Sequence, residues 1–270
     1  MYRMFVRYWF PLTLICVIAL AASSATAESS GSSLPTPDEV FVLAGQSNMS
    51  GRGFPLSKGA PTNPDLLVWR KDHWEVAADP LANPEDSMNG IGPGMSFGLK
   101  AVTVLAPETL GLVQCAVRGT TISKWQPSHT VYSNCIDQVR AAGGHIDGIL
   151  FLQGESDATN KDDAGSWAKR FKVVLTAFRS DLGPDVPIVM AQIGKINSSD
   201  FPYQKTVRDQ QAKAVGQSAG LTMIMTLDLK TQSDGVHFTV DSQKTLGTRF
   251  AAAWWQLRQV FLPLSSRHHV

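Results

Sequence analysis

Four short polar segments of the chain carry the residue types that hydrolytic enzymes use. They supply a serine, a glycine with a bare amide, a side-chain amide and an Asp-His pair, in the segments GQSNM (45–49), RGTTISKW (118–125), QGESD (153–157) and SDGVHFT (233–239). A serine hydroxyl is a weak nucleophile unless a neighbouring base accepts its proton and a third group orients that base. Asp234 and His237 are close enough in sequence for one loop to carry both. Asp234 would then accept the Nδ1 proton of His237, and Nε2 would face Ser47.

Attack by Ser47 on a carbonyl would place negative charge on an oxygen, which N–H donors must stabilise. The candidate donors are the backbone N–H groups of Ser47 and Gly119 and the side-chain amide of Gln153. The serine does not stand in a G-x-S-x-G motif, because Met49 occupies the position of the last glycine. This argues against the nucleophile elbow of α/β-hydrolases.

Other residues of these segments each permit two interpretations. Glu155 and Asp157 could be the paired carboxylates of a glycosidase, but their close spacing on a tight loop favours bracing of the site by hydrogen bonds. Trp125 could stack on a sugar ring or pack beneath a strand end. Arg52 could contact an acidic sugar or remain solvated.

The elements that would position these segments alternate along the chain. Short runs rich in Val, Ile and Leu, without strict alternation, occur at 40–44, 110–117, 146–153, 186–194 and 221–228. Such runs are typical of strands covered on both faces. Between and after them, apolar residues recur at helical spacing at 131–144, 162–183, 201–220 and about 241–261.

This alternation predicts an α/β fold, a three-layer α/β/α sandwich around a mostly parallel central sheet of about five strands. Ligands bind such sheets at the carboxyl ends of the strands, which is where the polar segments stand. Residues 53–95, rich in Pro, Asn and Gly, are predicted to form a long ordered excursion beside the sheet.

The first residues have the order of a secretory signal peptide. Two arginines precede an apolar run that ends in Ala25-Thr26-Ala27. The alternative is a transmembrane anchor, but the small residues at the end favour cleavage after Ala27. We therefore expect a signal peptide (1–27), a linker (28–39), one domain (40–262) and a polar tail (263–270), with the mature protein secreted or periplasmic and not bound to a membrane.

Composition excludes some partners and leaves the cysteines open. The formal net charge of +1 gives no case for nucleic acid as a partner. No C-x-x-C or H-E-x-x-H motif is present, so we expect no metal site and no cofactor. Cys16 leaves with the signal peptide, and Cys115 and Cys135 could form one disulfide or remain two buried thiols.

Five segments together resemble the SGNH/GDSL hydrolase superfamily, whose fold is flavodoxin-like, and within it the carbohydrate esterase branch. That branch includes sialate O-acetylesterase-like proteins, plant carbohydrate esterases and acetylxylan esterases. The similar segments are LAGQSNMSGRG (43–53), GPGMSFG (92–98), VRGTTISKW (117–125), LQGESDA (152–158) and DGVHFT (234–239). The resemblance extends over nearly the whole mature chain.

The resemblance implies a residue role at each matching position. Ser47 would be the nucleophile, His237 the base and Asp234 its orienting group, with Gly119 and Gln153 contributing to the oxyanion hole. We expect the neighbouring polar residues to support the site, namely Gln46, Asn48, Glu155 and Asp157.

The expected activity is removal of O-acetyl groups from a carbohydrate, either acetylxylan, another acetylated glycan or an O-acetylated sialic acid. A non-catalytic carbohydrate-binding protein on the same scaffold is the alternative, and a glycosidase that uses Glu155 is a weaker one.

Overall fold

A mostly parallel sheet forms the middle layer of the protein. The computed structural model describes Met1 and residues 34–105 and 107–261, and within them seven strands pair in the order β3-β2-β4-β1-β5-β6-β7. Every neighbouring pair is parallel except β2 and β3. The strands are β1 (Glu39–Gly45), β2 (Leu66–Arg70), β3 (His73–Val76), β4 (Leu110–Gln114), β5 (Gly148–Leu152), β6 (Ile188–Ala191) and β7 (Leu221–Ile224). Apart from Met1, the predicted signal peptide lies outside the described residues, as do the first part of the linker and the polar tail.

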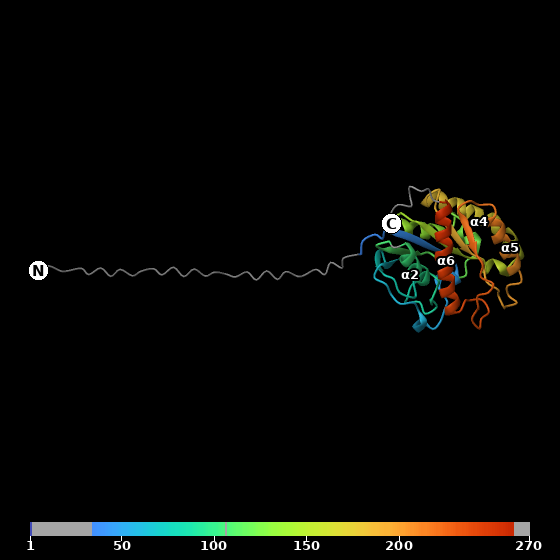
Figure 1. Ribbon diagram of the computed structural model, residues 1–270, viewed down its shortest axis with the longest axis horizontal. Helices are drawn as coiled ribbons and strands as arrows, with labels where there is room; N and C mark the ends of the chain where they lie inside the picture. The colour runs from blue at the N-terminus through green and yellow to red at the C-terminus, as the bar shows by residue number, and fades with distance from the viewer. Residues whose placement is uncertain (2–33, 106, 262–270) are drawn as a thin grey trace. The chain divides into compact units, whose positions relative to one another are not determined.

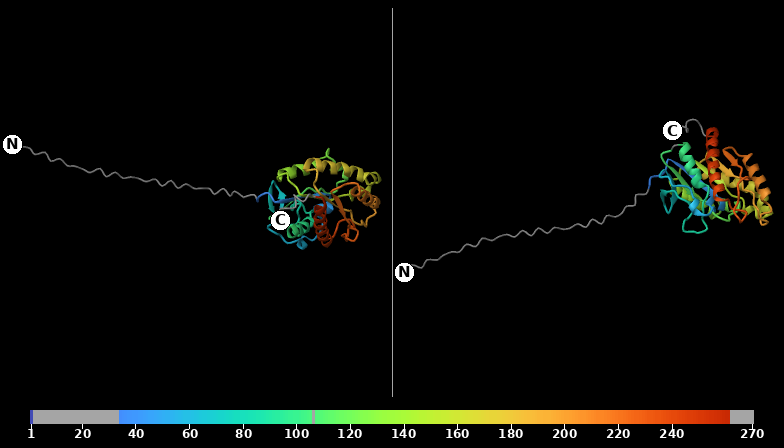
Figure 2. Two further views of the ribbon diagram at one scale, coloured as in Figure 1. Left: turned by 45° about the horizontal axis from the view of Figure 1, so that its top comes forward. Right: turned by 60° about the horizontal axis from the view of Figure 1, so that its bottom comes forward.

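Helices cover both faces of this sheet, as the views in Figure 1 and Figure 2 show. The helices α2 and α6 pack together on one face, and α3, α4 and α5 lie on the other. Their bounds are α2 (Gly94–Leu105), α3 (Thr130–Ala141), α4 (Lys161–Leu182), α5 (Gln204–Val215) and α6 (Val240–Phe261). The predicted three-layer α/β/α fold is therefore confirmed.

Aromatic side chains join the sheet to each helical layer. Phe41 on β1 packs edge-on against Phe97 of α2 and Trp254 of α6, with ring centroids 4.8 and 4.9 Å apart. On the opposite face, Phe151 of β5 contacts Phe171 of α4 at 5.2 Å. Because β1 and β5 are central, their residues are buried on both faces, which explains why they read as continuous apolar runs.

The prediction for residues 53–95 was wrong in one respect. The segment does not only pass beside the sheet, because it contributes β2 and β3 to one sheet edge and raises the strand number from about five to seven. The two strands are joined by Lys71 and Asp72, whose φ angles are +50° and +62°. Two left-handed residues in a row are typical of a type I′ hairpin turn, which usually carries Asn-Gly or Asp-Gly. This turn has no glycine, so the usual hairpin signal is missing from the sequence.

The two cysteines among the described residues are bonded to each other. Cys115, just after β4, forms a disulfide with Cys135 on α3. Of the two alternatives that the sequence left open, the structure contains the disulfide.

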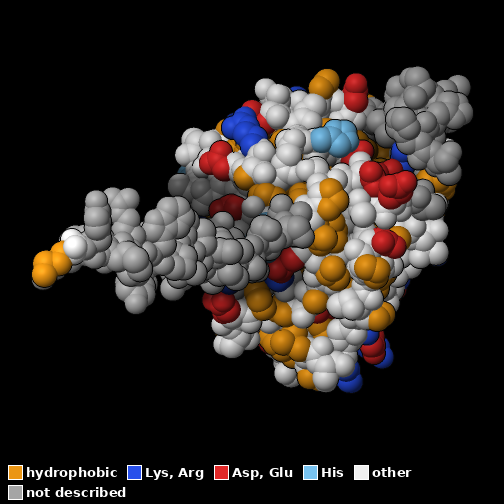
Figure 3. Space-filling model, turned by 90° about the vertical axis from the view of Figure 1, so that its left-hand side faces the viewer, with side chains coloured by type: hydrophobic (Ala, Val, Ile, Leu, Met, Phe, Trp, Pro, Cys, Tyr) orange, Lys and Arg blue, Asp and Glu red, His pale blue; other side chains and the backbone are white. Residues whose placement is uncertain are grey.

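The surface carries charges of both signs. On the face shown in Figure 3, acidic and basic side chains lie at several separate places between apolar and uncharged groups. None of the described helices is both long and apolar enough to cross a membrane. Nor do the described residues contain a group of three or more His, Cys, Asp or Glu side chains that could hold a metal ion.

Candidate active site

Ser47 lies at the carboxyl end of the central strand β1, where the chain turns sharply out of the sheet. Gly45 permits this turn because it has no side chain. Its φ is +141°, and its backbone lies so close to β5 that a Cβ would stand 1.9 Å from the Leu152 carbonyl oxygen. Gln46 then donates its N–H to that same oxygen at 2.9 Å. Ser47 follows as the first residue of the single helical turn α1 (Ser47–Ser50). The polar residues after the apolar run are thus the residues that leave the sheet edge.

The residues predicted as a triad lie in hydrogen-bonding contact. His237 Nε2 is 3.0 Å from Ser47 Oγ, and His237 Nδ1 is 2.7 Å from Asp234 Oδ2. The other oxygen of Asp234 accepts the N–H groups of Val236 and His237, each at 2.9 Å. Burial alone would raise the pKa of the Asp234 carboxyl, but these hydrogen bonds outweigh it and hold the pKa below its usual value. The carboxylate therefore stays ionised, and this favours the arrangement in which Nδ1 carries the proton and Nε2 can accept one from Ser47.

Asn48 fixes the loop that carries the histidine. Its side-chain oxygen accepts the N–H of Phe238 at 3.0 Å, and its Nδ2 donates to the carbonyl oxygen of Val236 at 3.3 Å. These two residues flank His237, so one side chain holds the loop on both sides of the imidazole. Asn48 Nδ2 also donates to Glu155 Oε1 at 2.7 Å.

Glu155 is a buried carboxyl with one oxygen unused. Its side chain is 1% exposed, and Oε2 has no hydrogen-bond partner in the described part of the chain. Burial raises the pKa of Glu155, and the hydrogen bond from Asn48 offsets only part of that rise. Glu155 therefore accepts from Asn48, and its role in supporting the site stays a prediction.

The side-chain amide of Gln153 is committed to the protein interior, which corrects the prediction that it faces an oxyanion. Gln153 is fully buried; its Nε2 donates to Asp157 and, at 2.9 Å, to the carbonyl oxygen of Thr120, while its Oε1 accepts from Trp167 Nε1 at 2.8 Å. All groups of the amide are therefore used away from Ser47. The sequence could not reveal this, because the partners come from three different segments.

Gln46, the residue before Ser47, is held by the oxygen end of its side-chain amide. Its Oε1 accepts from Gln153 Nε2 at 3.3 Å and from the N–H groups of Gly154 and Ser156 at 3.2 Å. Three donors on one oxygen determine which end of the amide is the oxygen. The Nε2 end makes no hydrogen bond with the described residues, and Gln46 lines the same cavity as Ser47.

Asp157 closes this network from beneath. Both of its oxygens accept the Ile122 N–H, at 3.0 and 3.1 Å, and Oδ2 also accepts from Gln153. Burial raises the pKa of Asp157 to about 7, although the hydrogen bonds from Gln153 and Ile122 act in the opposite direction. Asp157 does not line the cavity, so it supports the site through Gln153.

A cavity of about 330 Å³ opens above Ser47. It brings together most of the sequence-predicted residues with several that were not predicted, and is lined by Gln46, Ser47, Arg52, Met88, Arg118, Gly119, Glu155, Ser156, Phe201, Asp234, Val236 and His237. Gly119 has a φ of +66°, and a Cβ built there would meet no atom within 4 Å, so its backbone faces open space. The N–H groups of Ser47 and Gly119 donate no hydrogen bond to the described residues. This cavity has the size and the mixed lining of a small-ligand site.

Arg52 and Trp125, the two residues predicted as possible substrate contacts, differ in whether they reach the cavity. Arg52 lines the cavity and donates from Nη1 to the carbonyl oxygen of Met88 at 2.8 Å. Trp125 is fully buried, donates to Thr120 Oγ1 and packs against Phe151, so its ring is not available to a sugar. The packing interpretation of Trp125 holds, and the stacking interpretation was wrong.

Comparison with known proteins assigns the chain to a family. Residues 37–256 match the family described as carbohydrate esterase, sialic acid-specific acetylesterase. A probable carbohydrate esterase of Arabidopsis thaliana is 30% identical over 244 residues, which cover 81% of this chain and 90% of the plant protein. The chain therefore belongs to this carbohydrate esterase family, and the predicted resemblance is confirmed.

Solved structures share the architecture. The X-ray structure of an Arabidopsis thaliana protein is 29% identical, with a TM-score of 0.73 over 82% of this chain and 98% of that one. NanS, at 17% identity, has a TM-score of 0.67 over 84% of this chain and 100% of its own. A carbohydrate acetylesterase from Xanthomonas citri, at 18% identity, has a TM-score of 0.63 over 83% of this chain and 56% of its own. At these lower identities the likeness concerns the fold alone.

Proposed function

We propose that the protein is a serine esterase that removes O-acetyl groups from carbohydrates through an acetyl-enzyme intermediate. The observation that carries the proposal is the unbroken hydrogen-bonded series Ser47–His237–Asp234 at the edge of an open cavity. Membership of a carbohydrate esterase family supports the substrate class.

In the first half-reaction, Ser47 Oγ attacks the acetyl carbonyl carbon while His237 Nε2 takes the hydroxyl proton. Asp234 stabilises the imidazolium that forms. The carbonyl oxygen becomes an oxyanion, and the tetrahedral intermediate then collapses. The bond to the sugar oxygen breaks, and His237 returns the proton to that oxygen as the sugar leaves.

In the second half-reaction, water attacks the acetyl-enzyme. His237 accepts a proton from the water, a second tetrahedral intermediate forms, and the bond from Ser47 Oγ to the acetyl carbon breaks. The proton returns to Ser47, and acetic acid leaves and gives its proton to the solvent as it becomes acetate. Both half-reactions use the same base and the same oxyanion donors.

We infer that three N–H groups act as those donors. The backbone N–H groups of Ser47 and Gly119 and the Nε2 of Gln46 belong to residues that line the cavity, and none of the three donates within the described part of the protein. We assign the side-chain donor to Gln46, with Gln153 and Asp157 as the residues that orient it.

The two alternatives are less well supported. A non-catalytic binding protein would not require the Ser47–His237–Asp234 alignment. A glycosidase would require two carboxyl groups that flank a scissile bond across a cavity. Glu155 lines the cavity, but Asp157 is buried below it in contact with Gln153.

We further propose that the protein is exported and cleaved after Ala27. The disulfide supports this proposal, because such bonds persist mainly in oxidising compartments. Mass spectrometry of the exported protein should find a chain that begins at Glu28. A mature chain that retains Met1 would contradict cleavage.

The esterase proposal is tested by hydrolysis of 4-nitrophenyl acetate and by acetate release from acetylated xylan and from O-acetylated sialic acid. Ser47→Ala and His237→Ala should each lower kcat by several orders of magnitude, and the double variant should be no worse, because the residues act as a unit. Ser180→Ala, at an exposed serine on α4, is the matched control. Near-normal turnover in Ser47→Ala, with loss in Glu155→Gln, would overturn the proposal in favour of carboxylate chemistry.

A further inference from the structure

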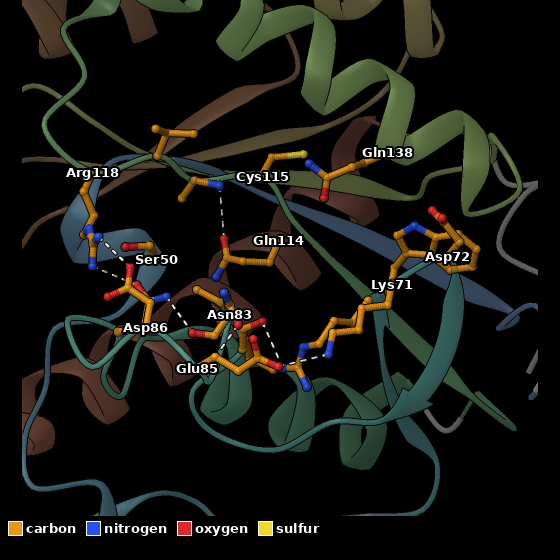
Figure 4. A pocket seen from close by; sticks show the side chains of 17 residues that line it. Ser50, Lys71, Asp72, Asn83, Glu85, Asp86, Gln114, Cys115, Arg118 and Gln138 are labelled. Atoms are coloured by element: carbon orange, nitrogen blue, oxygen red, sulfur yellow. Dashed lines mark hydrogen bonds and ion pairs between the residues drawn. The ribbon is translucent and has the colours of Figure 1, made fainter.

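A second, larger cavity lies beside the catalytic one. Its volume is about 560 Å³, and it is lined by residues of the β2–β3 hairpin, of the segment 81–89 and of the end of β4 with the residues after it, by Ser50 of α1 and by Gln138 of α3. Figure 4 shows Arg118, Ser50 and Asp86 at one end of this cavity and Lys71 and Asp72 at the other, with Gln114 and Asn83 between them.

The two cavities share a wall. Arg118 lines both of them, and it donates to Asp86 Oδ2 at 2.7 Å and to Asn89 Oδ1 at 3.2 Å. Arg52, from the loop that follows Ser47, donates to the carbonyl oxygen of Met88. Two arginines from catalytic loops therefore hold the segment 86–89 between the cavities.

The floors of the cavities are also close together. Ser47 lines the catalytic cavity and Ser50 lines the second one, and both belong to the single turn α1. Three residues of an α-helix advance by about 4.5 Å along its axis. A chain of linked rings that enters one cavity is therefore near the other.

The charges of the second cavity are balanced. Its lining contains three basic residues, Arg70, Lys71 and Arg118, and three acidic ones, Asp72, Glu85 and Asp86. Each basic group is already paired: Arg118 with Asp86, Lys71 with Glu85 at 3.1 Å, and Arg70 with Glu75. No unpaired cation of the lining is left to hold a carboxylate, so a uronic acid or a sialic acid gains little here.

Uncharged polar groups and an aromatic ring complete the lining. Gln138 reaches the cavity from α3, as Figure 4 shows, and its side chain makes no hydrogen bond within the described residues. Asn83 uses its Oδ1 to accept the Glu85 N–H, and its Nδ2 has no partner among the described residues. Trp69 is half-buried and lines the same cavity. Amides that can still hydrogen-bond, together with an aromatic surface, suit a ring that carries hydroxyl groups and no charge.

We propose that the second cavity binds an uncharged sugar unit adjacent to the acetylated one, so that the substrate is an oligosaccharide or polysaccharide rather than a free monosaccharide. This proposal rests on the proposed esterase function. It adds that the substrate extends across the Arg118–Asp86 wall, from the acetyl group at Ser47 toward Gln138 and Asn83.

The test compares three kinds of substrate: 4-nitrophenyl acetate, acetylated monosaccharides, and acetylated trisaccharides of xylose, mannose and glucose. Wild-type kcat/KM should be at least tenfold higher for one of the trisaccharides than for its monosaccharide. Gln138→Ala and Asn83→Ala should each raise KM for that trisaccharide by about two- to tenfold, the effect of one lost hydrogen bond. Neither variant should change turnover of 4-nitrophenyl acetate, and Gln217→Ala, at an exposed glutamine after α5, is the matched control.

Each failure has a distinct meaning. Absence of Ser47-dependent hydrolysis of 4-nitrophenyl acetate would overturn the esterase function itself. Ser47-dependent hydrolysis with equal kcat/KM for monosaccharides and trisaccharides would leave the esterase in place and refute the second cavity as a sugar site. A preference for O-acetylated sialic acid over every neutral trisaccharide would also refute it. Thermal unfolding of Gln138→Ala and Asn83→Ala separates loss of binding from loss of folded protein.

Discussion

Replacement of Gln46 tests the assignment of the oxyanion donors most directly. Gln46→Ala removes the Nε2 donor from the cavity and also removes the oxygen that accepts from Gly154 and Ser156. The variant should therefore lose both rate and stability. These two effects can be measured separately.

The size of each effect follows from the contacts. Loss of one oxyanion donor costs about 10²–10³ in kcat, or roughly 2.7–4 kcal/mol of transition-state stabilisation. The buried N–H of Gly154 and the partly buried N–H of Ser156 lose their acceptor. An unsatisfied buried group costs about 1–3 kcal/mol, so unfolding free energy should fall by about that much for Gly154 and by less for Ser156. KM for 4-nitrophenyl acetate should change little, because the donor acts mainly on charge that develops in the transition state.

Gln46→Glu separates rate from stability. Glutamate keeps an oxygen for the N–H groups of Gly154 and Ser156, but only its protonated form can donate to an oxyanion. Gln46→Glu should therefore lose activity relative to the wild-type protein as pH rises and the new carboxyl ionises.

The assay is steady-state hydrolysis of 4-nitrophenyl acetate across a pH series, with urea unfolding of the same proteins. Gln217→Ala serves as the glutamine control. At about pH 9 a free glutamate is fully ionised. If the kcat of Gln46→Glu equals that of the wild-type protein at this pH, the proposed role of Gln46 is refuted. A larger loss of kcat in Gln153→Ala than in Gln46→Ala, after both are corrected for folded fraction, would refute it too.

Three further predictions concern the supports of the site. Burial raises the folded-state pKa of Asp157 to about 7. The contribution of Asp157 to stability is therefore complete below about pH 4 and is lost as pH rises through 7. The fall in unfolding free energy over this pH range should be smaller in Asp157→Asn than in the wild-type protein, by up to about 4 kcal/mol. Removal of the disulfide by Cys115→Ala with Cys135→Ala should lower unfolding free energy by about 3 kcal/mol in urea titrations, given a separation of 20 residues. Asn48→Ala should lower kcat by up to about 10²-fold, because the histidine loop is displaced. Glu155→Gln keeps an acceptor for Asn48 and should lower kcat less than tenfold. Equal losses of kcat in the two variants would contradict this order.

The parts of the site that sequence reasoning could predict are those set by local spacing. Asp234 and His237 meet because they are three residues apart on one loop, and their contact at 2.7 Å was expected from that spacing. Ser47 was expected at a sheet edge because an apolar run ends just before it. Such features depend on a few neighbouring residues, which the sequence displays directly.

The roles of the two glutamines could not be predicted in the same way. Gln46 and Gln153 are separated by 107 positions and both follow buried strands. Which amide faces the cavity depends on Trp167, Thr120 and Asp157, which occupy the hydrogen-bonding groups of Gln153. Because these three partners come from distant segments, their hydrogen bonds to Gln153 produce no pattern that a single sequence displays.

The same distinction applies to the substrate. The segments that build the catalytic cavity follow strands with clear apolar runs, so they could be located from the sequence. The second cavity instead depends on the hairpin turn at Lys71 and Asp72, whose left-handed residues include no glycine, and on the segment 81–89. Because Arg118 forms a wall of both cavities, the catalytic machinery and the surface beside it are joined at one side chain. The proposed reaction thus uses residues at strand ends, whereas the proposed choice of glycan depends on an irregular segment that two arginines contact. We therefore expect changes in that segment to alter the preferred glycan while Ser47, His237 and Asp234 stay in place.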